Sequence, residues 1–400
     1  MSIKIYSSSA YKRFFRRRTA GQKIIPSKID VVDNATIVVQ GRAGFGVYDA
    51  AGRFVNSSRQ IRGNNNQVVH SHIHIDAATP FIDETVVFFG NVYPQFGHFL
   101  LEHMNRAWGL LHDITNGARV VLVNEHNYDT VPEYMYVLIE MMGVPRDRVI
   151  ILTETTRFRR VIVPSQGFNI ARWANDEFVR AYEHIAAGVP DTDKYEKIYM
   201  SRDALESRRT YGEHVVERIF ENNGFKIIRP EKMSLGEQVG AMKHCRVLAG
   251  CAGTALHMAL FMPCGGTVIQ IKRNRRLKCN ADTQNLINMV KKLNGVFISG
   301  SVERVATDHG GNAPQIIGVT KYMRQFFDEN GFKYTDADTI PDPTEIAEYD
   351  AMLAKFCAEH GSVRFNKFKH KLVRYLACFV PGRVNRNYFR HWMQRVLKIG

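Results

Sequence analysis

Hydrophobic residues recur at helical spacing within residues 91–111, NVYPQFGHFLLEHMNRAWGLL. On a helical wheel of about 100° per residue, one side collects apolar side chains, namely Leu100, Met104, Ala107, Trp108 and Leu111. The opposite side collects His98, Glu102, Asn105, Arg106 and Gly109. Two interpretations stay open: an amphipathic helix with a solvated polar face, or a helix whose polar face lines a cleft.

Apolar runs and helical patterns alternate through most of the chain. The first series predicts strands at 84–90, 118–124 and 147–153, with a helix near 131–142. The second predicts strands at 195–202, 225–230, 246–250, 267–271 and 296–300, and helices at 212–224, 234–245, 254–262 and 285–295. Alternation of this kind is typical of parallel sheets. We therefore expect an α/β fold made of two Rossmann-like domains, with the functional site in the cleft between them.

The same pattern divides the chain into five expected parts. These are a basic N-terminal tail (1–29), an acceptor-side α/β domain (30–190), a Rossmann-like nucleotide-sugar-binding domain (191–305), a polar connecting segment (306–361) and a pair of basic amphipathic helices (362–400).

Charge is concentrated at the two ends of the chain. The net charge is +15 at pH 7, yet residues 361–400 hold ten Lys and Arg residues, residues 1–18 hold six, and neither end has an acidic residue. The middle of the chain is therefore close to neutral, unlike a uniformly basic nucleic-acid-binding protein. Two basic ends favour attachment to an acidic surface.

The C-terminal segment interleaves these cations with aromatic and aliphatic residues at steps of three and four. Three interpretations stay open: helices lying on anionic lipid, a helix pair docked on the protein body, or a nucleic-acid-binding element. We favour the lipid surface. No apolar run is long enough to span a membrane, the N-terminus has no secretory h-region, and the six cysteines show no zinc spacing. We expect a cytoplasmic protein, peripheral on the inner face of the membrane.

The strongest local motif is RVLAGCAGTALHM, residues 246–258. A buried strand ends, glycines follow, and a helix starts at Thr254. Glycines allow a ligand to approach the backbone, and free amides at a helix start attract a diphosphate. Gly253 and Thr254 are therefore candidate phosphate-binding residues, although a tight turn without ligand explains the pattern as well.

Basic residues follow two other predicted strands. Arg202, Arg208 and Arg209 stand in SRDALESRRT, and Lys272 follows TVIQI. Guanidinium groups suit phosphate oxygens, but a solvated loop is the alternative interpretation. SLGEQ (234–238) predicts a capping box between Ser234 and Glu237, with Gln238 able to face a ligand.

Taken in order, these motifs resemble glycosyltransferase family 61, the DUF563 group. The resemblance covers roughly residues 40–300 and rests on GHFLLEHMN, then SR with RR, GF, EQ, and the glycine-rich turn before ALF. It implies a two-domain GT-B arrangement and inverting, metal-independent transfer from a nucleotide-sugar to a glycan, such as a lipid-linked or capsular polysaccharide. No cofactor or metal ligand is implied, and no nucleic acid.

The resemblance also implies roles for individual residues. Arg202, Arg208, Gly253 and Thr254 would meet the diphosphate. His98 and Glu102 would face the acceptor, together with Asn105 and Arg106. Inversion needs a base for the acceptor hydroxyl; either His98 or Glu102 fits, and we favour Glu102 with His98 orienting it.

Two departures from the family pattern keep other functions open. The family's commoner His-Gly-Ala turn is replaced here by Ala252-Gly253-Thr254, so the histidine's role is lost or passes to His257. Gln270 stands where a glutamate is common. The alternatives are a non-catalytic, membrane-associated binding protein of polysaccharide assembly and, less favoured, a nucleic-acid-binding protein.

Overall fold

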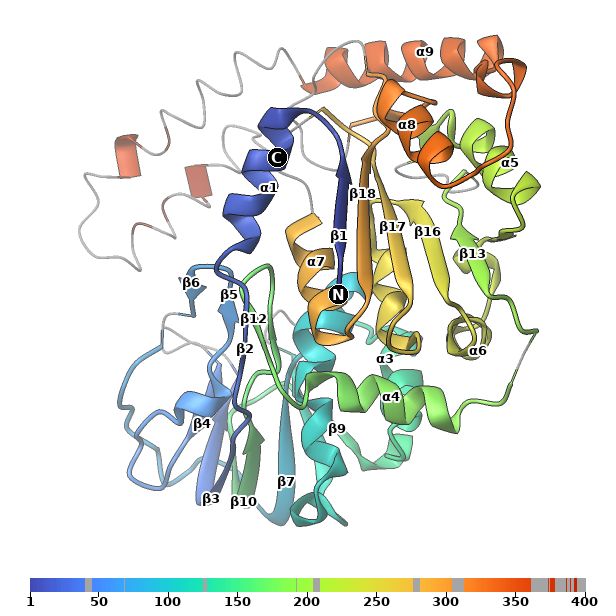
Figure 1. Cartoon of the computed structure of the whole chain (residues 1–400). Helices are drawn as coiled ribbons and strands as arrows, with labels where there is room; N and C mark the ends of the chain where they lie inside the picture. The colour runs from blue at the N-terminus through green and yellow to red at the C-terminus, as the bar shows by residue number, and fades with distance from the viewer. Residues whose placement is uncertain are drawn as a thin grey trace. The chain divides into compact units, whose positions relative to one another are not determined.

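The computed structural model describes residues 1–39, 45–67, 69–124, 128–191, 193–203, 209–275, 281–303 and 313–360, with short stretches at 373, 375–377, 386, 389 and 392–393. The chain divides into two compact units (Figure 1). Unit 1 comprises residues 1–200, 230–270 and 279–297, and unit 2 comprises 201–229, 271–278 and 298–400. The fold is α/β, as the sequence predicts. The GT-B arrangement and the predicted domain boundaries stay predictions.

The first sheet of unit 1 has six strands in the order β4-β3-β10-β7-β8-β9. Their bounds are Gly46–Tyr48, Ile29–Val38, Thr156–Pro164, Phe81–Asn91, Arg119–Val123 and Val149–Leu152. Strands β10, β7, β8 and β9 pair in parallel, and β3 pairs antiparallel with β10. The strands predicted at 84–90, 118–124 and 147–153 are confirmed.

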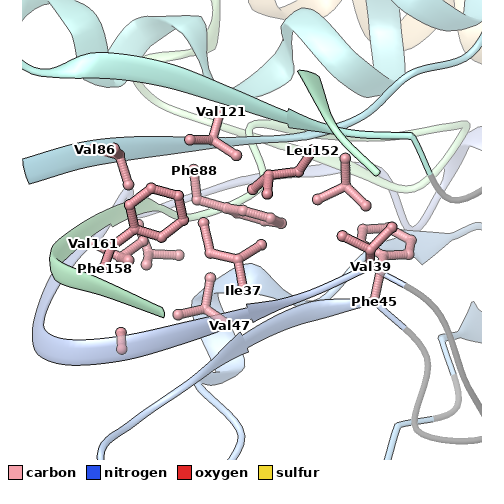
Figure 2. Packing of buried hydrophobic residues seen from close by; sticks show 13 residues of the cluster. Ile37, Val39, Phe45, Val47, Val86, Phe88, Val121, Leu152, Phe158 and Val161 are labelled. Atoms are coloured by element: carbon pink, nitrogen blue, oxygen red, sulfur yellow. The ribbon is translucent and has the colours of Figure 1, made fainter. Parts of the chain in front are cut away.

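The core of this sheet consists of β-branched and aromatic side chains. Figure 2 shows Ile37, Phe88 and Val121 pointing into one shared space, and each is fully buried. Burial of such side chains stabilises the fold by about 1.5–3 kcal/mol each. The core fixes β7, whose carboxyl end leads into the polar 91–111 stretch.

The second sheet of unit 1 orders its strands β1-β18-β17-β16-β13. Their bounds are Ile3–Tyr6, Asn294–Ser299, Thr267–Lys272, Val247–Cys251 and Lys197–Met200. β13 and β16 pair in parallel. The predicted alternating series is confirmed with two differences. Thr254–Phe261 (η7) is a 3₁₀-helix, and the helix predicted at 285–295 lies at Ala281–Val290 (α7). The capping box of Ser234 and Glu237 is also confirmed.

The helices of unit 1 are α1 (Ser9–Thr19), α2 (Phe96–His98), α3 (Glu133–Glu140), α4 (Phe178–Gly188), α6 (Leu235–Lys243) and α7 (Ala281–Val290). Short strands β2 (Lys23–Ile25), β11 (Phe168–Asn169) and β12 (Trp173–Asn175) form a third sheet, and β5 (Ile61–Arg62) pairs with β6 (Asn65–Asn66). Among the described residues, no helix is both long and apolar enough to cross a membrane.

The prediction of a regular helix over residues 91–111 is wrong. The stretch contains α2, then a π-helical turn η2 (Phe99–His103), then a 3₁₀-helix η3 (Met104–Leu111). Two carbonyls in the turn accept side-chain donors: Leu100 O accepts from Tyr182 Oη, and Glu102 O from Asn105 Nδ2 at 2.6 Å. Those carbonyls are drawn away from a regular helical ladder, and π turns of this kind are frequent at functional sites.

The basic N-terminal segment, expected as a tail, is folded onto unit 1. Tyr11 and Phe15 of α1 are buried against Phe297 and Ala281. Arg18 adds an ion pair to Asp282, with 2.6 Å between Nη2 and Oδ2. The amphipathic spacing of the two rings therefore docks the helix by one face.

Unit 2 has its own small cores. Strands β14 (Thr210–Tyr211) and β19 (Gln315–Ile316) pair in parallel. The unit also contains helices α5 (Glu213–Asn222), α8 (Lys321–Glu329) and α9 (Pro343–His360), and strand β15 (Lys226–Ile228). Tyr211, Ile316, Tyr349 and Leu353 form one cluster. The basic helices predicted for 362–400 fall almost wholly outside the described residues.

Candidate active site

The site begins with a histidine–carboxylate pair just beyond strand β7. Nδ1 of His98 and Oε2 of Glu102 form a short hydrogen bond. The Glu102 side chain is only 4% exposed, while that of His98 is 27% exposed. A buried carboxylate that holds one ring nitrogen fixes the orientation of the imidazole and leaves the other nitrogen for chemistry.

Arg62 completes this cluster from a different part of the chain. Its Nε lies 3.1 Å from Oε1 of Glu102, and its Nη2 lies 3.1 Å from both ring nitrogens of His98. Both oxygens of Glu102 are therefore engaged, one by His98 and one by Arg62. The Arg62 side chain is 55% exposed, so it is the member of the cluster with room to move.

Two side-chain amides clamp the backbone around Arg62. Gln166 accepts from the N–H of Ile61 and donates to its carbonyl, both at 2.8 Å. Asn169 accepts from the N–H of Gly63 at 2.6 Å and donates to its carbonyl at 3.1 Å. Each side-chain amide thus forms the pair of backbone hydrogen bonds that a neighbouring β-strand would form. This amide clamp (Gln166 and Asn169) holds the residues on either side of Arg62, which preorganises the guanidinium.

Arg106 holds the backbone that leads to Arg62. Its guanidinium is 1% exposed and donates to the carbonyls of Pro164, Ser57 and Arg59 at 3.0–3.2 Å. Burial lowers its pKa to about 9. Arg106, expected beside the acceptor, instead ties residues 57–59, which lead to Arg62, to strand β10.

The other polar residues of the stretch are buried as well. Asn105 is fully buried, and its backbone carbonyl accepts from Gly167 N at 3.0 Å. His103 stacks between the rings of Tyr93 and Phe99. Burial lowers the pKa of His103 to about 3, helped by the charges of His98, Arg106 and Arg62. The interpretation of a solvated polar face is therefore wrong: this face is packed inside unit 1.

The glycine-rich turn lies against the start of the same stretch. A Cβ at Gly97 would stand 2.1 Å from Cγ2 of Thr254, so the two backbones approach as closely as glycine permits. Thr254 is otherwise exposed. The carboxyl ends of β7 and β16, from the two sheets of unit 1, thus deliver His98 and Thr254 to one place. The two strongest sequence candidates are brought together.

Other candidates have local partners. Gln238 donates to the carbonyls of Pro230 and Met233, so it supports its own helix start. In unit 2, Arg209 pairs with Glu345 and Glu348. Arg202 is half-buried, and its Nε has no partner among the described residues.

Lys272 and Arg208 are the remaining residues of the predicted nucleotide site. Lys272 is 7% exposed, and its charge lowers the pKa of Glu303, although burial raises that pKa on balance. Arg208 lies outside the described residues.

Two surface aspartates, Asp191 and Asp336, pair with basic groups. Asp191 receives Lys243 and His244, which hold its pKa far below the usual value. Asp336 pairs with Arg324. Within the described ranges, no group of three or more His, Cys, Asp or Glu side chains is placed to hold a metal ion.

Comparison with known families assigns this part of the chain to a family. Residues 96–269 match the family model described as Glycosyltransferase 61. The chain contains a glycosyltransferase 61 domain. The match starts at the first residue of α2 and ends in β17, so it includes His98, Glu102 and Thr254. No curated protein matches the chain. The family indicates glycosyltransferase activity and, in general, a nucleotide-sugar donor and a glycan acceptor.

Sequence reasoning missed Arg62 and the amide clamp of this glycosyltransferase 61 domain. Arg62 is separated from His98 by 36 positions and lies before the matched segment. The only local signal is the RGN turn, where Gly63 adopts a φ of +63°. A tight turn predicts a hairpin, but it does not say which side chain the hairpin presents.

Proposed function

We propose that the domain transfers a sugar, with inversion, from a nucleotide-sugar to a hydroxyl of a glycan acceptor. The observation that carries this proposal is the His98–Glu102–Arg62 cluster seated against the glycine-rich turn at Thr254. One side of this place has a base with its orienting carboxylate. The other has the backbone amides at the start of η7, which suit a diphosphate.

We assign the base to His98, with Glu102 as its orienting group, which reverses the preference drawn from the sequence. Both oxygens of Glu102 are already bonded, to His98 and to Arg62. His98 is the more exposed of the pair. In the proposed step, Nε2 of His98 takes the acceptor proton while the hydroxyl oxygen bonds to the anomeric carbon. The bond from that carbon to the diphosphate oxygen breaks, and its electron pair leaves with the nucleotide.

In this proposal Arg62 contacts both His98 and Glu102. Its Nη2 occupies the edge of His98 that the acceptor hydroxyl must reach. Since its side chain is more than half exposed, we expect Arg62 to turn aside when substrate enters while its Nε keeps Glu102. The leaving diphosphate would be stabilised by the amides at Thr254 and by the arginines, with Arg202, Arg208 and Lys272 as further candidates, and without a bound metal.

The test is activity together with nucleotide binding. We would measure melting temperatures against UDP-, GDP-, CMP- and dTDP-sugars, with and without EDTA, because a ligand of the native state raises the midpoint. His98→Gln should lower kcat by roughly 100-fold or more and leave the nucleotide-induced shift intact. A shift abolished by EDTA would contradict metal-independent transfer. Full activity of His98→Gln would refute the assignment of the base.

We also propose that the protein works at the inner membrane face on a lipid-linked or capsular acceptor, held by residues 362–400. Helix α1 supports this, since Arg13, Arg16 and Arg17 are exposed on the side away from its docked rings. Each cation near anionic lipid contributes about 1 kcal/mol. Deleting 362–400 should reduce sedimentation of the protein with phosphatidylserine vesicles, and changing the three arginines to Gln should reduce it further. Unchanged sedimentation of both variants would refute the location.

A further inference from the structure

A chain of three buried polar side chains runs from the glycine-rich turn into helix α7. Nδ1 of His257 lies 3.1 Å from Oε1 of Gln284, and Gln284 Nε2 donates to Oδ1 of Asn288 at 3.1 Å. The three residues are 5%, 1% and 0% exposed. An unmade hydrogen bond at this depth is costly, and Nδ2 of Asn288 is the one amide group of the three with no partner among the described residues.

The orientation of the two amides determines which nitrogen of His257 carries the proton. With the amide nitrogen of Gln284 donating to Asn288, its oxygen faces His257. That oxygen can only accept, and Nδ1 must therefore carry the ring proton and donate it. Nε2 is left with a lone pair and can only accept.

His257 stands beside the proposed reaction centre. It lies three residues after Thr254 in the 3₁₀-helix η7, and residues at this spacing are stacked on one face of such a helix. Thr254 on that face touches Gly97, the neighbour of His98. Burial lowers the pKa of His257 to about 4, and the charge of His98 contributes to the decrease. The ring is therefore neutral at physiological pH.

Titratable groups on the elements packed against η7 are engaged elsewhere. On α7, Asp282 pairs with Arg18, and Lys291, the residue after the end of α7, pairs with Glu183 of α4. Tyr182 of α4 donates to Leu100 O. His98 of α2 is held by Glu102. On β16, the Sγ atom of Cys251 lies 3.9 Å from Tyr199 Oη, and on α6 Glu237 is bonded within its capping box.

We propose that His257 Nε2, held as an acceptor by Gln284 and Asn288, binds a hydroxyl of the sugar carried by the donor nucleotide. The proposal rests on the proposed function and names a contact for the sugar rather than the phosphates. Only a donor group satisfies Nε2, and sugar hydroxyls donate while ionised phosphates do not. The three hydrogen-bonded side chains would therefore select a ligand with a hydroxyl group, next to the backbone amides proposed to bind the diphosphate.

The first experiment needs no substrate. ¹⁵N NMR of the full protein should show His257 as the Nδ1–H tautomer with no titration between pH 5 and 8. An Nε2–H tautomer, or a titration near pH 6.5, would overturn the proposal whatever the enzyme's activity.

The second experiment uses the nucleotide-sugar that raises the melting temperature most, compared with its matching free nucleotide. In the wild type the sugar should add to the shift; in His257→Leu this added shift should vanish while the shift from the free nucleotide remains. His257→Gln, which places an amide oxygen near Nε2, should restore part of it and covers the case that the leucine variant fails to fold. An added shift unchanged in His257→Leu overturns the proposal.

Gln284→Glu tests the chain itself. A carboxylate at this position favours the imidazolium, so His257 should gain a proton as the pH falls and lose its acceptor role. The KM for the donor should then rise up to tenfold per pH unit below the new pKa, with kcat changed far less. Gln315→Glu, at a glutamine of unit 2 that is 3% exposed, is the matched control and should show no such pH dependence. A pH-independent KM in Gln284→Glu refutes the chain. Loss of every nucleotide effect in the wild type refutes the proposed function instead.

Discussion

Replacing Gly97 by Ala tests whether the contact between α2 and the glycine-rich turn positions the catalytic histidine. The new Cβ would lie 2.1 Å from Cγ2 and 2.7 Å from Cβ of Thr254. Ordinary carbon–carbon contact is about 3.5–4.0 Å. The two segments must therefore separate by roughly 1.5 Å, and His98, the next residue, moves with α2.

Two opposing effects determine the result for stability. Alanine in place of glycine favours a helix by about 1 kcal/mol, whereas overpacking of this kind costs about 1–3 kcal/mol. The net loss of unfolding free energy is therefore small, about 0–2 kcal/mol. The activity should fall far more, because a misplacement of about 1 Å at a reacting group costs on the order of 100-fold.

The assay is kcat/KM for sugar transfer alongside urea denaturation. Gly188→Ala is the matched control, since its Cβ meets nothing within 4 Å, and it should retain full activity. Thr254→Gly removes the clashing atoms, so the double variant should match Thr254→Gly alone. Wild-type activity in Gly97→Ala would refute the reasoning, as would a double variant no better than Gly97→Ala.

Three further predictions concern the supports of the site. Arg106→Met should lower the unfolding free energy by about 3 kcal/mol or more, because three buried carbonyls lose their donor; urea denaturation measures it, and a loss below 1 kcal/mol contradicts it. Asn169→Leu should lower kcat without further loss when combined with Arg62→Met, since the clamp acts through that arginine; additive losses in this double-mutant cycle would count against the clamp. His103 has a folded pKa of about 3 against 6.5 in the unfolded chain, so the unfolded state binds more protons between these values. Stability should fall as the pH drops from 6.5 toward 3, by up to about 1.4 kcal/mol per pH unit, and thermal denaturation of His103→Gln should show a shallower slope.

Hydrophobic periodicity predicted most of the secondary structure of unit 1. Strands such as 118–124 are bounded by turn residues and buried on both faces, so local sequence and tertiary packing agree. The prediction failed at 99–111, because Tyr182 and Asn105 draw carbonyls away from an α-helical ladder. Tyr182 lies 82 positions from Leu100, and no local pattern contains competition from so distant a side chain.

The candidate site was only half predictable. His98 and Thr254 each stand at the end of a predicted strand, and that position is visible in the sequence. Arg62 and its amide clamp depend on which loops fold over the strand end, and this is decided by long-range contacts. Arg106 was predicted to face the acceptor, but it is buried and binds backbone carbonyls. A helical wheel does not distinguish a buried cation from an exposed one.

The N-terminal strand has a consequence for synthesis. Ser2 N donates to Oδ1 of Asn294 at 2.8 Å, Gly295 N donates to Ser2 O at 2.9 Å, and β1 lies beside β18. A ribosome adding about 5–20 residues per second needs roughly 15–60 seconds to produce the partner strand. Throughout that interval β1 and the apolar face of α1 have emerged without their partners. Nascent chains are then most exposed to aggregation and to chaperones, and an N-terminal truncation would leave β18 as an open sheet edge in the finished protein.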